Sequence, residues 1–392
     1  MVFLAWLMSS HKTRVSLRII VAGILLQFGF GLLILKTRPG QLLFAAIGKM
    51  FEKFLGFVDA GSAFVFGSNF KEHPFAFKVL PTIIFFSSFM AILYYLGVMQ
   101  LVVRLFGKLM RVTLRTSGAE SLAAAANIFL GQTEAPLVVR PYVRTMTRSE
   151  LMAIMVPGFG STAGGVLAAY VEMGIDAGHL VTASVLSAPA GLLIAKVLQP
   201  EIEQPLTAGD ADLELGDTGS NVIEAAAIGA SEGVKLAINV AAMLIAFLAL
   251  IAMFDAIIGW SGAKLGQHWS LATGLSYVFA PIAWLIGIES ADCFKVGELL
   301  GIRMVANEFV AYDKLAAWLR TDSGVVLSPR TQVLITYALC GFANFSSIGI
   351  QIGGIGAMAP ERQKDLAKLG FRAMLGGTLA CFMTACVAGV LI

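Results

Sequence analysis

The chain has 392 residues, of which 57% are hydrophobic and only 14% charged, and its mean hydropathy is +0.81. Soluble domains carry about 25% charged residues, so this composition excludes an ordinary soluble protein and predicts an all-α polytopic membrane protein that has the lipid bilayer as its solvent. The net charge of +3 indicates no nucleic-acid partner, because the basic residues lie in short clusters between apolar runs.

Eight apolar runs follow one another, and each is long enough, or nearly so, to cross a bilayer. About 20 apolar residues suffice for one crossing, and a helix satisfies its own backbone hydrogen bonds in lipid. Before them, MVFLAWLMSS is too short to span alone and lacks the cleavage pattern of a signal peptide. The runs are 18–35, 77–103, 151–170, 180–198, 236–254, 271–288, 333–360 and 371–392.

Three basic clusters between the runs predict the topology, because Lys and Arg next to membrane helices favour the cytoplasmic side. All three clusters should therefore face the cytoplasm. The segment 201–224 is acidic, contains no Lys or Arg, and is expected to be a polar linker on the same side. The clusters are Arg104, Lys108, Arg111 and Arg115; Arg140, Arg144 and Arg148; and Arg362, Lys364, Lys368 and Arg372.

Four short segments rich in polar residues or glycine, called islands here, interrupt the apolar sequence. They are NIFLGQTEAPLVVRPY at 127–142, PGFGSTAGGVLAAY at 157–170, MVANEFVAY at 304–312 and CGFANFSSIGIQIGGIGAMAP at 340–360. The first and third each place an amide near a carboxylate, and the second and fourth each follow Gly-Phe with small polar residues. This order indicates an internal repeat, which is common in secondary transporters whose broken helices hold substrate and ion at the membrane midplane.

The carboxylates of Glu134 and Glu308 are the most informative residues of these islands. A charge at the centre of a membrane helix costs about 2.5–3.5 kcal/mol, and neither residue has a Lys or Arg within four positions. Either each lies at a membrane edge or pairs with a distant Arg, or both face a wet cavity and accept hydrogen bonds from a polar solute. The second interpretation favours a neutral substrate that is rich in hydroxyls or amides, because like charge repels an anion.

The glycines of the second and fourth islands indicate unwound helix or close helix packing. Each glycine in a helix interior costs about 1 kcal/mol relative to alanine, whereas small residues also let membrane helices approach closely. Unwinding is favoured for Gly158, Gly160, Gly164 and Gly165, beside Ser161 and Thr162. For Gly353, Gly354 and Gly356 both explanations stay open.

Several other function classes find no support. No GxxxxGK[ST] motif for ATP is present, so uphill transport would need an ion gradient. The four His and four Cys residues are scattered without metal-ligand spacing or a catalytic partner, so the sequence predicts neither a metal site nor an enzyme. A passive channel would need repeated pore-lining rings.

At these motifs the chain resembles the concentrative nucleoside transporters, sodium-coupled nucleoside symporters of bacterial type. The resemblance rests on GQTEAPLVVRPY, NEFVAY and CGFANFSSIGIQIGGIGAMAPERQKDLAKLGFRA, in order, and covers nearly the whole chain. It implies about eight transmembrane helices, two re-entrant helical hairpins with tips at GQTE and NEF, and a homotrimer in the cytoplasmic (inner) membrane. Members of this length begin with a complete membrane helix, whereas only ten residues precede His11, so either the chain is shortened or that helix is dispensable.

The resemblance also assigns substrate and ion ligands. Gln132, Thr133 and Glu134 would address the nucleobase, with Val166 and Phe342 packing on it. Glu308, Asn344 and Ser347 would bind the ribose hydroxyls. For Na+ the matching ligands are the Asn127 side chain, the Leu130 carbonyl, the Ser161 hydroxyl and the Thr162 carbonyl. Neutral oxygen ligands favour Na+ over H+ coupling, although proton-coupled members exist.

The mechanism expected from these assignments is alternating access, with Na+ ordering the first hairpin before the nucleoside binds. The expected regions are N-terminal scaffold helices 1–115, first hairpin and following helices 116–200, linker 201–224, long scaffold helix 225–290, second hairpin and broken helix 291–360, and C-terminal helix 361–392. Uridine and other pyrimidine nucleosides are the expected substrates. The small Gly131 beside Gln132 hints that purine nucleosides also fit.

Overall fold

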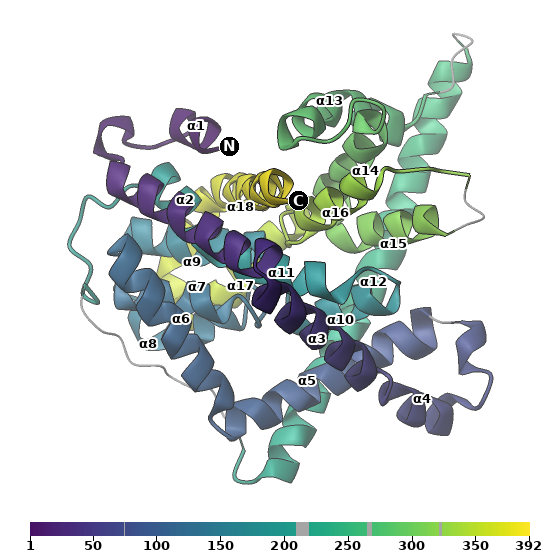
Figure 1. Ribbon diagram of the computed structural model, residues 1–392, viewed down its shortest axis with the longest axis horizontal. Coiled ribbons are helices and arrows are strands. Elements are labelled where there is room, and N and C mark those ends of the chain that lie inside the picture. Colours follow the sequence, from purple (N-terminus) through teal and green to yellow (C-terminus); the bar gives the residue numbers. More distant parts are fainter. Residues whose placement is uncertain (74, 209–218, 265–268, 321–323) are drawn as a thin grey trace.

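The computed structural model describes residues 1–73, 75–208, 219–264, 269–320 and 324–392, and these residues form helices and connecting turns without a strand (Figure 1). The helices are α1 Val2–Leu7, α2 Leu17–Gly31, α3 Arg38–Leu55, α4 Val58–Phe66, α5 Leu80–Tyr95, α6 Val98–Leu114, α7 Gly118–Ala126, α8 Arg140–Val143, α9 Arg148–Gly160, α10 Gly164–Glu172, α11 Ala177–Leu198, α12 Val222–Ala263, α13 Leu271–Ile286, α14 Cys293–Val305, α15 Glu308–Leu319, α16 Pro329–Leu339, α17 Phe345–Met358 and α18 Gln363–Leu391.

Among the described residues, five helical stretches are long and apolar enough to cross a membrane: Leu17–Lys36, Phe75–Tyr95, Arg148–Glu172, Ala177–Leu198 and Pro360–Leu391. Shorter apolar helices lie at Leu248–Ser261, Leu271–Ile286 and Phe345–Met358. The all-helical prediction is confirmed. Two apolar runs that were taken as continuous are each divided: 77–103 at Gly97, whose φ is 81°, and 333–360 at Gly341, whose φ is 152°.

The two halves of the chain repeat one order of elements. A pair of short helices (α7 with α8, then α14 with α15) is followed by a broken helix (α9 and α10, then α16 and α17) and a long apolar helix (α11, then α18). The two breaks meet, because Phe342 N donates to the Ser161 carbonyl at 3.2 Å and the Thr162 hydroxyl lies 3.6 Å from the Cys340 thiol. A break is therefore present at 161–163, but the glycines expected to be unwound are helical: Gly158 and Gly160 lie in α9, and Gly164 and Gly165 lie in α10. Gly353, Gly354 and Gly356 lie inside α17, whose helix is intact.

Close packing around the breaks depends on glycine. A Cβ at Gly377 of α18 would lie 2.3 Å from the Phe159 Cβ and 2.8 Å from its carbonyl carbon. We expect Gly377→Ala to lower the free energy of unfolding by about 1–3 kcal/mol, because the overpacked backbone of α9 has to move. The control is Gly353→Ala, where nothing lies within 4 Å of the new Cβ. Thermal denaturation of the two detergent-solubilised variants tests this, and equal stability would contradict the packing.

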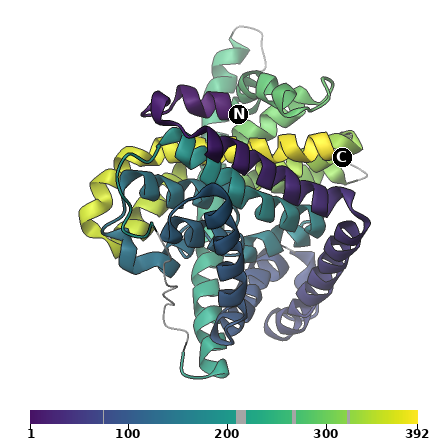
Figure 2. The same cartoon turned by 60° about the vertical axis from the view of Figure 1, so that its left-hand side comes forward.

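The long helix α12 crosses α5 at small residues. A Cβ at Gly229 would lie 2.6 Å from the Ser87 carbonyl oxygen, and one at Gly233 would lie 2.7 Å from the Ile84 Cα. With 42 residues at about 1.5 Å each, α12 is about 63 Å long, and it extends beyond the remaining helices at both ends (Figures 1 and 2). The helix expected around 236–254 is therefore present and much longer than its apolar stretch.

The second and third basic clusters lie on the same side of the molecule. Arg148 pairs with Asp365 at 3.1 Å, and Arg362 donates to the Arg144 carbonyl at 3.0 Å. Arg144 also pairs with Glu361 at 2.5 Å. This shared face agrees with the topology predicted from the Lys and Arg distribution.

A buried ionic cluster at the start of α7 and α9 was not anticipated from the sequence. Lys196 Nζ lies 2.6 Å from Glu120 Oε2, both side chains being at most 3% exposed. Ser117 Oγ donates to Glu150 Oε1 at 2.6 Å, and Ser117–Glu120 and Thr147–Glu150 each form a capping box. These contacts fix the N-termini of α7 and α9 against α11.

The expected linker 201–224 is only partly a linker. The Thr207 hydroxyl donates to Glu150 at 3.1 Å and the Thr207 carbonyl accepts from Gly118 N at 2.7 Å, so its beginning belongs to the buried cluster. Its end enters α12 at Val222. Residues 209–218 lie outside the described part of the chain.

Candidate functional site

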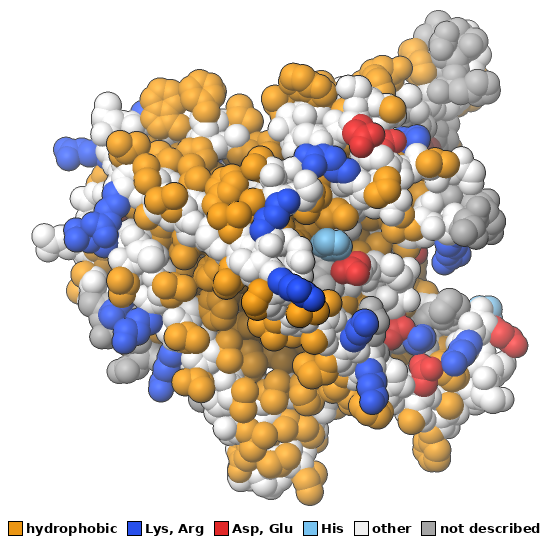
Figure 3. All heavy atoms as spheres, viewed as in Figure 1, with side chains coloured by type: hydrophobic (Ala, Val, Ile, Leu, Met, Phe, Trp, Pro, Cys, Tyr) orange, Lys and Arg blue, Asp and Glu red, His pale blue; other side chains and the backbone are white. Residues whose placement is uncertain are grey.

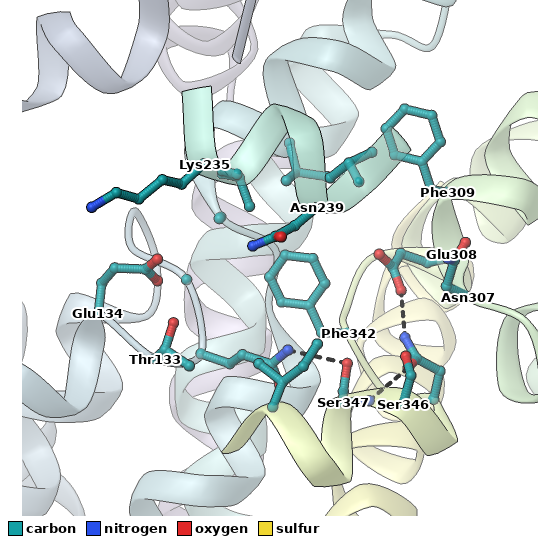
Figure 4. Close-up of a pocket in the computed structure, with 18 of the residues that line it drawn as sticks. Thr133, Glu134, Lys235, Asn239, Asn307, Glu308, Phe309, Phe342, Ser346 and Ser347 are labelled. Carbon is teal, nitrogen blue, oxygen red and sulfur yellow. Dashed lines mark hydrogen bonds between the residues drawn. The ribbon is translucent and has the colours of Figure 1, made fainter. Parts of the chain in front are cut away.

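A cavity of about 510 Å³ opens where the loop after α7, the two helix breaks, the α14–α15 junction and α12 come together (Figure 4). All eight predicted substrate residues line it: Gln132, Thr133, Glu134, Val166, Glu308, Phe342, Asn344 and Ser347. Figure 4 shows Thr133 and Glu134 on one side, Glu308 on the other, and Phe342 between them. The two carboxylates thus face one cavity from opposite walls.

Glu308 is held by two donors from different elements, Asn344 before α17 and Tyr170 of α10. It is the first residue of α15 and only 4% exposed. Its Oε2 accepts from Asn344 Nδ2 at 2.9 Å and its Oε1 accepts from the Tyr170 hydroxyl at 3.2 Å. The N-terminal end of a helix also favours a negative charge. A carboxylate has about four acceptor sites, so capacity remains for hydroxyl donors of a solute.

Asn344 positions this carboxylate because its other atoms are engaged. Its Oδ1 accepts from Ser347 N at 2.9 Å and from the Ser346 hydroxyl at 2.7 Å, which caps α17. The side-chain amide can therefore point its NH₂ group only toward Glu308. The start of α17 and the start of α15 are linked through this one residue.

Gln132 is fixed by a chain of amides and hydroxyls. Its Nε2 donates to Ser347 Oγ at 3.0 Å, and its Oε1 accepts from Gln351 Nε2 at 3.1 Å. Gln351 is fully buried and also donates to the Met155 carbonyl at 3.1 Å. Gly158 makes room for this arrangement, because a Cβ there would lie 2.8 Å from Gln351 Nε2. The predicted base-binding and ribose-binding residues are thus parts of one network.

Gly131 lines the cavity, and its missing side chain is required by its own loop. A Cβ at Gly131 would lie 2.2 Å from Glu134 Oε2 and 3.2 Å from the Ala163 Cβ. The glycine therefore accommodates the carboxylate of its own loop. The structure thus gives this glycine a role within its own loop, and the fit of purine nucleosides stays a prediction.

The wall contributed by α12 was missed. Glu232, Lys235 and Asn239 of α12 line the cavity, and Lys235 pairs with Glu232 at 2.7 Å. Asn239 points toward the cavity, while Lys235 extends above Glu134 (Figure 4). Asn239 is an amide inside an apolar run, as Gln132 is, so the same criterion could have identified it from the sequence.

Arg303 was missed as well. It lies near the end of α14, is 1% exposed, and its guanidinium donates to the Gly341 carbonyl at 3.4 Å and to Cys381 Sγ at 3.1 Å. It therefore ties the second short-helix pair to the break between α16 and α17. An arginine within an apolar segment is itself a functional-site signal.

The predicted Na+ ligands lie in two adjoining segments. Asn127 and Leu130 belong to the loop after α7, and Ser161 and Thr162 to the break between α9 and α10. Gly164 N donates to the Phe129 carbonyl at 3.0 Å, which joins the loop to the break. In the described structure, Asn127 Oδ1 and Ser161 Oγ are buried and have no hydrogen-bond partner.

These oxygens fit a cation. The Asn127 amide is oriented by donating its Nδ2 to the Ala123 carbonyl at 3.0 Å, which leaves Oδ1 available. A buried acceptor without a partner costs about 1–3 kcal/mol, and ligation of a cation would recover this. Uncharged oxygen ligands are the kind that hard cations prefer.

A polar cavity between two broken helices, inside a molecule of apolar helices, defines a membrane protein of the secondary-transporter class. Comparisons with known proteins agree. The family "Na+ dependent nucleoside transporter C-terminus" matches residues 179–389, "Na+ dependent nucleoside transporter N-terminus" matches 1–69, and "Nucleoside recognition" matches 76–177. The chain therefore belongs to the concentrative, Na+-dependent nucleoside transporter family and is an integral, multi-pass membrane protein.

Individual relatives support the same conclusion. The chain is 47% identical over 403 residues to human solute carrier family 28 member 3, covering 100% of this chain and 58% of that protein. It is 45% identical to an uncharacterized transporter of Haemophilus influenzae, covering 100% and 95%. The chain thus spans little more than half the length of the human relative. These relatives are transporters and not enzymes.

Solved structures share the fold. CNTnw in an inward-facing substrate-bound state superposes with a TM-score of 0.94 at 43% identity, covering 100% of this chain and 95% of that one. A variant of CNTnw in an outward-facing state gives 0.95 at 42% identity, covering 100% and 96%.

Proposed function

We propose that the protein is a secondary active symporter that imports nucleosides across the cytoplasmic (inner) membrane, driven by the Na+ gradient. The observation that carries this proposal is the cavity itself. Two carboxylates stand on opposite walls of this cavity, and hydrogen bonds through Asn344 and Ser347 join one of them, Glu308, to Gln132. A pair of buried oxygens without partners lies in the adjoining segments. Such a site suits a neutral, hydroxyl-rich solute together with a hard cation.

The two walls divide the substrate between them. Gln132, Thr133 and Glu134 address the nucleobase, against which Val166 and Phe342 pack. Glu308, Asn344 and Ser347 bind the ribose hydroxyls, because the oriented Glu308 carboxylate can accept from two neighbouring hydroxyls at once. Asn239 of α12 faces the same cavity and closes it opposite the helix breaks (Figure 4).

The moving part consists of the two hairpins and the broken helices, in the regions 116–200 and 291–360. They share the Ser161–Phe342 and Asn344–Glu308 hydrogen bonds and so move as one body. The scaffold is α5 with α12, which cross at Gly229 and Gly233. The re-entrant course of the hairpins and the assembly into a homotrimer follow from the family resemblance.

Uptake into proteoliposomes tests this function. With an inward Na+ gradient, purified protein is expected to accumulate labelled uridine above its external concentration. Replacing Na+ with choline should abolish accumulation. Accumulation driven by an inward H+ gradient in the absence of Na+ would instead identify an H+-coupled symporter. Uptake that only equilibrates and ignores both gradients would identify a passive channel. Competition by thymidine, adenosine and guanosine then defines the substrate range.

A further inference from the structure

A second, smaller cavity lies outside the transport site. It has a volume of about 210 Å³ and lies where the segment after α1 meets the start of α9, the end of α11 and the first turns of α18. Its lining combines hydroxyl, amide and mainly basic side chains: Ser10, His11, Arg148, Gln199, Asp365, Lys368, Leu369 and Arg372.

The cavity carries excess positive charge. Its one acid, Asp365, is shared, with Oδ1 at 3.1 Å from Arg148 and Oδ2 at 3.1 Å from Arg362. Arg372 donates to the Leu198 and Met8 carbonyls, both at 2.8 Å, so its guanidinium is oriented without an acid. In the described part of the chain, neither Arg372 nor Lys368 forms a salt bridge. Two cations therefore lack a counterion at this site.

The distribution of Lys and Arg predicts that this cavity lies on the cytoplasmic face. Arg148 comes from the second basic cluster, and Lys368 and Arg372 come from the third. That face of a bilayer carries the anionic lipids, and basic pockets between membrane helices bind their head groups.

The neighbouring helix α1 presents an apolar surface to the surroundings. Phe3 is 65% exposed and Leu7 45%, whereas Ala5 is fully buried. The Trp6 indole donates to the Lys12 carbonyl at 3.1 Å, and Lys12 Nζ lies 5.6 Å from the centre of its ring. Figure 3 shows hydrophobic side chains gathered over α1 at the upper left. Tryptophan beside lysine on a short apolar helix is typical of the membrane–water interface.

We propose that this cavity binds the phosphate group of an anionic phospholipid, whose acyl chains lie along the exposed side of α1. The ligand chemistry is a phosphate anion held by Lys368, Arg372 and Arg148, with His11 and Ser10 at the rim. Only two residues separate α1 from Ser10, so one lipid can reach both the basic cavity and the apolar helix. Such a lipid would join α1, α11 and α18 at the cytoplasmic edge.

Binding of dioleoyl phosphatidic acid to the detergent-solubilised full chain, followed by native mass spectrometry, tests this proposal. We expect Lys368→Gln to weaken the apparent affinity about fivefold, because one lysine near an anionic head group contributes about 1 kcal/mol. The matched control is Lys364→Gln, which removes the same charge one turn earlier on α18, outside the cavity lining. It should change the affinity by less than about twofold. Melting temperatures of both variants check that they fold.

Binding measurements with inorganic phosphate and with phosphatidylcholine identify the source of the phosphate group. If inorganic phosphate binds the wild type, competes with the lipid and loses affinity in Lys368→Gln, the site stands and its ligand is free phosphate. Dioleoyl phosphatidylcholine should bind weakly and equally to all three proteins. Equal phosphatidic acid affinity in the two variants, or phosphatidylcholine binding as strong as phosphatidic acid binding, would overturn the proposal.

Discussion

Replacing Glu308 with glutamine is expected to reduce the rate of uridine uptake by at least about 100-fold. The carboxylate is 4% exposed and is oriented by Asn344 and Tyr170, so it is ready to accept hydroxyl donors. A hydrogen bond to a charged group contributes about 1.5–3 kcal/mol, and two ribose hydroxyls would together lose about 3 kcal/mol or more, which is about 100-fold. The glutamine would also keep only one acceptor oxygen for Asn344, Tyr170 and the substrate hydroxyls together.

Substrate analogues separate a ribose contact from a general loss of folding. Wild-type protein should prefer uridine strongly over 3′-deoxyuridine, and Glu308→Gln should lose most of that preference. Glu298→Gln is the control, because Glu298 pairs with Lys314 and does not line the cavity. Uridine transport at the wild-type rate in Glu308→Gln, or unchanged discrimination between the two nucleosides, would remove Glu308 from the ribose site.

The composition of the cavity could be predicted because polar groups in apolar helices are costly and therefore rare. Glu134 and Glu308 each stand out within an apolar run, and the structure brings both to one cavity. The helix break beside Ser161 was foreseen for the same reason, since glycines and small polar residues cluster there. These features can be predicted from the local sequence, because the cost of burying a charge and the helix propensity are properties of individual residues.

Contacts between distant segments could not be predicted in this way. Lys196 appears in the sequence as one cation at the end of an apolar run, and its buried partner Glu120 lies in another helix. Glu232 and Lys235 of the α12 wall were missed because they become cavity residues only through the way α12 packs in the fold. Gly131 shows the same limit, because the sequence does not reveal that its missing side chain makes room for Glu134. Each case depends on which surfaces meet, and no single segment records that.

Removing one proposed Na+ ligand is expected to raise the Na+ concentration for half-maximal uptake at least about tenfold. Asn127→Ala deletes a buried amide oxygen that has no hydrogen-bond partner in the described structure, and Ser161→Ala deletes the corresponding hydroxyl. One lost ion–oxygen contact of about 1.4 kcal/mol corresponds to this factor, and transport at saturating Na+ should largely recover. The control is Ser62→Ala, which removes another buried hydroxyl without a partner, in the peripheral helix α4.

Coupling follows from the position of Asn127 in the chain. It begins the loop that carries Gln132 and Glu134, so a cation that fixes Asn127 would also order the residues that we propose to address the base. The effect is reciprocal: in wild-type protein, Na+ should lower the Kd for uridine and uridine should lower the Kd for Na+. Asn127→Ala should weaken both effects, measured by thermal stabilisation with each ligand alone and together. If uridine binding stays equally Na+-dependent in Asn127→Ala and Ser161→Ala, the cation binds elsewhere and this loop is not the coupling element.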